Sequence, residues 1–171
     1  MVDVQGLKDT FYQVLRDRIA AGNAARTVVI RGVLRPAVVV IENELPGAAV
    51  DGVAWPDAFC LHWTGLRLED GALSKAVLGC EIRYATDGTA EAGGLDRGRL
   101  LAAMDRELGA ALESGTHMAA GITVSENVSG AAIAVGTGTN IFWGELLPKP
   151  TKERDERLER SVEIEVFGYG D

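Results

Sequence analysis

The sequence predicts an α/β fold of the α+β type, in which an antiparallel, mixed-order sheet is flanked by two main helices. The first observation is the stretch Leu78–Tyr84, where apolar residues alternate with Gly79, Glu81 and Arg83 as in a strand with one buried face. The second is the stretch 96–112, where apolar residues recur three and four positions apart. A glycine-containing loop joins the two stretches, so we expect the helix to lie across the apolar face of the strand.

The first predicted helix runs from Asp3 to Ala21 and is ended by Gly22-Asn23. Its apolar stripe has helical spacing and consists of Leu7, Phe11, Val14, Leu15 and Ile19. Lys8, Arg16 and Asp17 fall on the opposite side, which indicates a helix with one solvent-facing surface.

Two runs rich in β-branched residues follow, Thr27–Gly32 and Ala37–Glu42, and the sequence between them contains Pro36. We interpret the two runs as a hairpin. The second run contains four consecutive apolar residues at 38–41, which predicts a strand in the interior of the sheet with both faces covered.

Residues 59–63 alternate as a third strand, and Leu78–Tyr84 is the fourth. Four consecutive strands with short connections predict an antiparallel meander between the two helices. We expect both helices to pack on the face that bears Cys80, Ile82 and Tyr84.

The second main helix is predicted to begin after Asp96, which can act as its N-cap, and to end at Gly115. Its apolar positions are Leu101, Met104, Leu108, Ala111 and Leu112. Short strands are predicted at 122–124, 133–135 and 139–143, and the alternation at 162–166 predicts a closing strand.

The whole chain, residues 1–171, is predicted to be a single domain with two unusual segments. A long loop at 43–56 contains two prolines and two glycines. A charged arm at 148–160 alternates basic and acidic residues, which favours an exposed arm or hairpin extension, with a short solvated helix as the alternative.

Composition limits the classes of function. The formal net charge is −8, which argues against sequence-specific or general nucleic-acid binding because phosphate contacts need a basic surface. The longest apolar runs are too short to span a membrane, and the first residues lack the pattern of a secretory signal. We therefore expect a protein that is made and kept in the cytosol.

Residues that could carry catalysis or bind a metal are not arranged in a recognisable pattern. His62 and His117 lack ligand-like spacing, and the glycine-rich stretch 135–140 lacks the lysine and helix of a phosphate-binding loop. Strand alternation places Cys60 and Cys80 on opposite sides of the sheet, which predicts two free thiols. We predict neither an enzyme nor a cofactor or metal.

A subunit interface is the functional surface that the sequence favours, with local packing as the alternative explanation. Apolar residues in loops nominate Trp55, Leu146 and Leu147. Charged residues of the arm and of the strand faces nominate Glu81, Arg83, Lys152, Arg154, Arg157, Glu163 and Glu165. We expect the charges of the arm to pair with those strand faces on a neighbouring subunit.

Five segments, taken in their order along the chain, point to a known family: the helix opening Gln5–Phe11, the runs Arg26–Val28 and Arg35–Val40, the helix start Leu95–Arg99 and the stretch Asn140–Trp143. In these segments and in the order of elements the chain resembles the tail terminator and related minor tail proteins of long-tailed phages. The resemblance implies an α/β subunit of a homohexameric ring, located in the virion tail and assembled in the host cytoplasm. Its partners would be further copies of itself, the tail tube and neck or connector proteins.

Two points stay open beside the resemblance. The arm at 148–160 is longer than expected for the simpler members of that family, so the chain could be the terminator or a neighbouring neck or tail-completion component. The alternative function is a small cytosolic ligand-binding domain or enzyme with a site near the loops 43–56 and 136–140.

Overall fold

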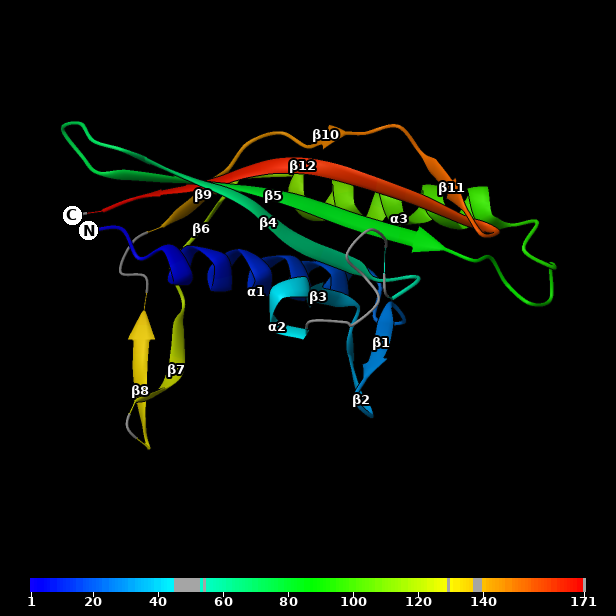
Figure 1. Cartoon of the computed structure of the whole chain (residues 1–171), viewed down its shortest axis with the longest axis horizontal. Coiled ribbons are helices and arrows are strands. Elements are labelled where there is room, and N and C mark those ends of the chain that lie inside the picture. The colour runs from blue at the N-terminus through cyan, green and yellow to red at the C-terminus, as the bar shows by residue number, and fades with distance from the viewer. Residues whose placement is uncertain (45–52, 54, 129, 137–139, 171) are drawn as a thin grey trace.

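A computed structural model describes residues 1–44, 53, 55–128, 130–136 and 140–170 of the chain. The helices are α1 (Val4–Gly22), the short α2 (Ile41–Glu44) and α3 (Arg97–Leu112). The strands are β1 (Thr27–Ile30), β2 (Val33–Pro36), β3 (Val38–Val40), β4 (Phe59–Glu69), β5 (Lys75–Thr86), β6 (Met118–Ala119), β7 (Thr123–Val128), β8 (Ala131–Gly136), β9 (Ile141–Trp143), β10 (Leu147–Pro148), β11 (Lys152–Arg154) and β12 (Arg157–Tyr169). A long, curved sheet carries the main helices, and two small hairpins project from it (Figure 1). The predicted α+β fold class is confirmed.

Helix α1 follows its predicted bounds closely. The Asp3 carboxylate accepts a hydrogen bond of 2.9 Å from the Gly6 amide, which satisfies one of the free donors at the helix start. Leu7, Phe11 and Leu15 are fully buried at a spacing of four residues, so one face of the helix points into the core.

Helix α3 also lies where the sequence predicts it, but Asp96 is not a side-chain cap. Its carboxylate instead accepts hydrogen bonds of 2.8 and 2.7 Å from the backbone and side chain of Thr89. The Asp96 carboxylate therefore links the two ends of the loop that precedes the helix, because Thr89 at the other end donates two hydrogen bonds to it.

The main sheet has the strand order β3-β4-β5-β12-β9-β6. Strands β5 and β12 pair antiparallel along their whole length and form its centre, with Ile164 opposite Cys80 and Val166 opposite Leu78. Because cross-strand partners lie on the same face, these residues form one apolar surface.

Both main helices cover that apolar surface, as predicted. A single buried cluster joins residues of α1 and α3 to Leu78, Cys80, Ile82 and Tyr84 of β5, each no more than 1% exposed. Tyr84 also donates a hydrogen bond of 2.7 Å to Asp105 of α3, and Arg160 of β12 pairs with the same carboxylate. The polar contact ties the helix to the two central strands.

The predicted hairpin between Thr27–Gly32 and Ala37–Glu42 is wrong. β1 pairs instead with β2, and Arg31 and Gly32 form the turn with φ angles of 51° and 79°. A tight two-residue turn with positive φ suits glycine and matches strand twist, so the chain reverses at Gly32 and not near Pro36. Ile41 and Glu42, predicted as strand, begin α2.

The predicted four-stranded antiparallel meander is also wrong, because β3 pairs parallel with β4. Val38, Val39 and Val40 are buried as expected, yet β3 forms one end of the sheet order and not its interior. A parallel pair requires a crossover connection, and the chain between β3 and β4 includes helix α2. Strands β4 and β5 do form the antiparallel hairpin that the sequence predicts.

The charged arm 148–160 is a hairpin extension, one of the forms that we predicted. β10 and β11 pair with β12, and Asp155 and Glu156 make the turn with φ angles of 48° and 65°. The return half of the arm is the start of β12, where Glu159 is only 8% exposed. The arm is therefore held against the sheet along much of its length.

The strands β7 and β8 make a separate two-stranded hairpin that projects from the sheet (Figure 1). Residues 45–52 and 54 of the predicted long loop and 137–139 of the glycine-rich stretch lie outside the described residues. Among the helices of the described part, none is long and apolar enough to cross a membrane.

Candidate functional site

The face of the main sheet opposite the helices is the first candidate surface, and we call it the open face. Alternation places Glu81 and Arg83 of β5 on it, together with Glu163 and Glu165 of β12. These four predicted interface residues therefore come together on one surface. Arg67 of β4 lies 3.8 Å from Glu165 and extends the row of charges.

Lys149 forms ion pairs with two carboxylates of the open face that would otherwise repel each other. Glu81 and Glu163 are direct cross-strand partners, and two carboxylates in such positions repel each other. The Lys149 ammonium lies 3.3 Å from Glu81 and 2.7 Å from Glu163, so it bridges them. The hydrogen bond to Glu163 contributes most to raising the pKa of Lys149.

Glu81 is the most strongly stabilised carboxylate of this group. Burial by itself raises the pKa of Glu81, but hydrogen bonds from Arg83 and Ser161 and the charges of Arg83 and Lys149 outweigh it and lower the pKa to about 2. Arg83 also contacts His62 at 3.0 Å. The open face is thus a connected network of charges and not a set of separate exposed groups.

Trp55 lies at one end of the open face and packs locally. It is partly buried against a small apolar cluster formed by Val53, Cys60 and Ala85. Arg157 closes this end, because it pairs with both oxygens of Asp87 at 2.7 and 3.1 Å and donates to the Val53 carbonyl. The bidentate contact is the main cause of the lowered pKa of Asp87.

Aromatic residues mark the other end of the open face. The rings of Phe142 and Phe167 stack at 5.7 Å, and Tyr169 meets both rings edge-on. The Lys75 ammonium lies 4.9 Å from the centre of the Phe167 ring. Phe167 and Tyr169 thus have intramolecular partners, although Tyr169 remains 38% exposed.

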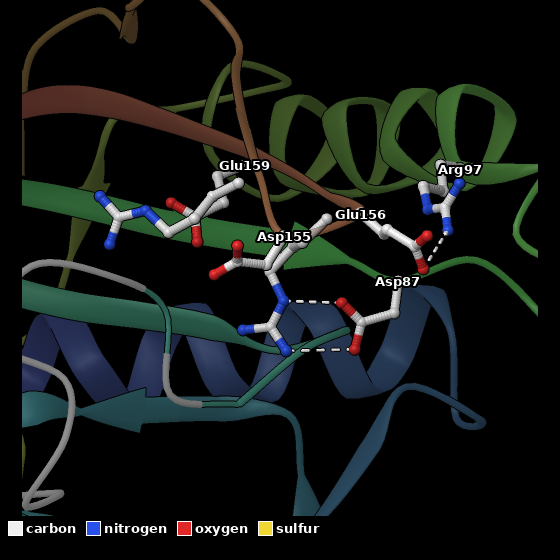
Figure 2. Close-up of a pocket in the computed structure, with 7 residues that line it drawn as sticks. Asp87, Arg97, Asp155, Glu156 and Glu159 are labelled. Carbon is white, nitrogen blue, oxygen red and sulfur yellow. Dashed lines mark hydrogen bonds and ion pairs between the residues drawn. The ribbon is translucent and has the colours of Figure 1, made fainter.

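A cleft of about 390 Å³ lies beside the β11–β12 turn (Figure 2). Carboxylates from Asp87, Asp155, Glu156 and Glu159 surround it together with three arginines. Arg157 is held by Asp87, and Arg97 lies 3.9 Å from Glu156. Most of these charges are paired within the cleft wall, so the arrangement is that of a structural ion-pair cluster.

Two glycines shape the loop that precedes Arg97. Gly88 and Gly94 have φ angles of 78°, and a Cβ atom on Gly88 would lie 2.6 Å from the Cα atom of Gly94. The two backbone segments therefore approach more closely than any side chain permits. This contact places the Arg97 guanidinium at the edge of the cleft.

The remaining predicted interface residues lie along β10 and β11. Leu146 is partly buried against the main core, whereas Leu147 is 59% exposed. Lys152 and Arg154 are exposed, and within the described part of the chain neither forms an ion pair. Of the residues nominated from sequence, Leu147, Lys152 and Arg154 are the ones that the single chain leaves most available.

Two apolar patches that sequence reasoning missed are the most exposed of the molecule. The hairpin patch consists of the cross-strand partners Val29 and Leu34 on β1 and β2, which are 60% and 67% exposed, and Val33 on the other face is 59% exposed. The edge patch consists of Leu66, Leu68 and Leu73 on β4 and the turn after it, each 53–65% exposed. The β1–β2 hairpin is a separate two-stranded sheet, and it lies well away from the turn between β4 and β5 (Figure 1). Alternation alone could not reveal them, because it does not show where a covering helix stops.

The described residues include no group of three or more side chains suited to hold a metal ion. Cys60 and Cys80 are free and buried in different clusters, as predicted. Burial raises the pKa of the Cys60 thiol to about 12 and that of Cys80 as well. Comparison with models of protein families and with curated proteins finds no match to this chain.

Proposed function

We propose that the protein is a structural subunit of a phage tail or tail-like particle. It acts as a tail terminator or tail-completion ring that caps the tail tube and joins it to the neck in the virion. It works by assembly with copies of itself and with tube and neck proteins, and not by catalysis.

The observation that carries the proposal is the pair of exposed apolar patches, one on the β1–β2 hairpin and the other on β4 and the turn after it. Large apolar side chains that gather on a surface are typical of protein interfaces. Two different patches on one chain suit head-to-tail contacts, in which each copy uses one patch on each neighbour. Such contacts close into a ring when the rotation between copies permits it.

The parts of the resemblance to tail terminators that the strand pairing leaves unchanged give further support, namely the opening helix, the helix start Leu95–Arg99 and the stretch Asn140–Trp143. The charged arm fits this function as well, since Lys152 and Arg154 on β11 are exposed cations without a partner in the described part of the chain. Exposed charges at the rim of an interface set register and partner choice more than affinity.

Native mass spectrometry and negative-stain microscopy test the proposal. We expect closed rings of the intact chain, and binding of these rings to the ends of tail tubes. A protein that stays monomeric at high concentration and never associates with tubes would contradict the structural function.

The role of the arm is tested with Lys152→Glu and Arg154→Glu in one variant. Deletion of 151–158 is unsuitable, because it removes Arg157 and Leu158 from the start of β12. We expect the double variant to fold normally and to cap tubes less well. The matched control carries Arg99→Glu and Arg106→Glu, which change two exposed cations of α3 in the same way, and it should cap tubes as the unchanged protein does.

A further inference from the structure

Strand β4 has an open edge over half its length. β3 pairs only with Phe59–Leu61, and among the described residues no strand lies beyond the segment Thr64–Glu69 on that side. β5 occupies the other side, with a register shift between Trp63 and Gly65. An exposed strand with unpaired N–H and C=O groups is a template for a further strand.

The side chains of this open edge are apolar on one face and charged on the other. Leu66 and Leu68 are opposite Leu78 and Ala76, so they belong to the apolar face of the sheet, yet they are 53% and 65% exposed. Arg67 and Glu69 lie on the other face and pair with each other at 2.8 Å. The proline or inward-pointing charge that commonly blocks an edge is absent from Thr64–Glu69.

The β1–β2 hairpin has the features of a strand donor. Val29 and Leu34 are cross-strand partners and are 60% and 67% exposed, so one face of the hairpin is apolar and uncovered. Ile30 on the other face is 6% exposed, so only the face of Val29 and Leu34 lacks the covering layer that stabilises a two-stranded hairpin in water. A tight turn at Arg31-Gly32 keeps the two strands in register.

The charges at the turn of the β1–β2 hairpin and at the turn after β4 are complementary. Arg31 is 76% exposed, and it must share the Glu44 carboxylate with Arg35, which holds that carboxylate at 2.5 Å. Asp70, at the turn after β4, is exposed and has no ion pair among the described residues. An exposed cation at the turn of the hairpin and an exposed anion beside the β4 edge favour contact between two copies of the chain.

We propose that the β1–β2 hairpin of one copy adds to the open β4 edge of the next copy. Val29 and Leu34 then contact Leu66 and Leu68, and Arg31 approaches Asp70, so that the sheet continues from subunit to subunit. The proposal rests on the proposed ring function and names the surfaces that form it. The two surfaces differ, so every copy both donates a hairpin and accepts one.

Three matched variants test this arrangement: Leu34→Lys in the hairpin, Leu68→Lys at the edge, and Leu95→Lys in the loop before α3. Leu95 is 92% exposed and lies in neither patch, so it controls for the leucine-to-lysine change itself. Circular dichroism checks that each variant is folded. Native mass spectrometry gives the state of assembly.

Leu34→Lys and Leu68→Lys should each weaken assembly by about tenfold or more and yield monomers, while Leu95→Lys forms the same rings as the unchanged protein. A mixture of the first two variants should give one-to-one dimers that grow no further. In that dimer the intact hairpin of the Leu68→Lys chain occupies the intact edge of the Leu34→Lys chain. Formation of the dimer also shows that both variants are folded.

Two results overturn the proposal. Rings that persist in both variants would show that other surfaces make the contact, and the ring function would then stand without this interface. Monomeric variants that fail to combine would show that hairpin and edge do not bind each other. A protein that forms no assembly before any substitution would contradict the ring function itself.

Discussion

The two faces of the main sheet are formed by the same strands, but one face is apolar and buried and the other is charged and open to water. On the helix-covered face, Leu78, Cys80, Ile82 and Tyr84 are almost completely buried, and helices from both halves of the chain pack on them. On the open face, the intervening Glu81 and Arg83 belong to a charge network that water still reaches. The comparison shows that the buried face supplies most of the stability, because exposed ion pairs contribute little.

The substitution with the largest expected effect is Ile82→Ala on the helix-covered face. Removing a fully buried side chain leaves a cavity, and we expect the free energy of unfolding to fall by roughly 2–5 kcal/mol. Chemical denaturation measures the change. Leu95→Ala is the control, because that residue is 92% exposed and lies in neither apolar patch, and its effect should stay within about 0.5 kcal/mol. Equal effects of the two substitutions would refute the assignment of the covered face.

A smaller effect is expected for Tyr84→Phe. The hydroxyl of Tyr84 donates to Asp105, a carboxylate that Arg160 also contacts, and hydrogen bonds to charged groups contribute about 1.5–3 kcal/mol. The ring stays in place, so the loss reports on the hydrogen bond and not on a cavity. Thermal unfolding of the variant measures it, and an unchanged midpoint would show that the contact between α3 and the central strands contributes nothing.

On the open face, the expected effect is a dependence on pH. The pKa of Glu81 falls from its ordinary value of 4.5 to about 2 in the folded protein. The ionised form therefore stabilises the fold above pH 4.5, and this contribution is lost as the pH falls from 4.5 towards 2. Glu81→Gln should flatten the decline in stability in that range. The comparison is made by denaturation at a series of pH values, and identical profiles would exclude the network as its cause.

The smallest effect concerns the two thiols, which lie in clusters on different faces. Cys60 and Cys80 are free, and burial raises the pKa of both thiols, so few thiolates form near neutral pH. We expect no change in the thermal midpoint on adding reductant. A thiol reagent should count two thiols in denaturant and react slowly with the folded protein. Fewer than two in denaturant would indicate a disulfide and a different strand register.

Local patterns predicted the parts of the fold that local forces determine. The helical spacing of Leu7 and Phe11, and the alternation of Ile82 with Glu81, correctly assign buried and exposed faces. Strand partners were predicted less well, since pairing depends on contacts between distant residues. The parallel pair of β3 and β4 is the clearest case. The turn at Gly32 did have a local signal, because glycine favours positive φ, but the predicted hairpin placed the turn near Pro36.

The candidate surfaces show the same limit. Alternation predicts that Glu81 and Arg83 share one face of their strand and that Glu163 and Glu165 share one face of theirs, and the pairing of β5 with β12 brings both pairs together. Lys149 was missed, although it bridges two of them, since its position depends on how β10 returns along β12. The exposure of Leu34 and Leu68 likewise depends on where α1 and β3 end in space, which no pattern within β2 or β4 records.

The central position of β12 has a consequence for how the protein is made. This strand is the last in the described chain, yet it separates β5 from β9 at the middle of the sheet. A ribosome releases the chain from its N-terminus onward, so β5 emerges long before its partner. Until residues 157–169 are free of the ribosome, the nascent chain exposes the apolar face and the bare edge of β5. Chaperone binding during translation would shield the chain during this interval, and truncations within the thirteen residues of β12 should leave an aggregation-prone chain.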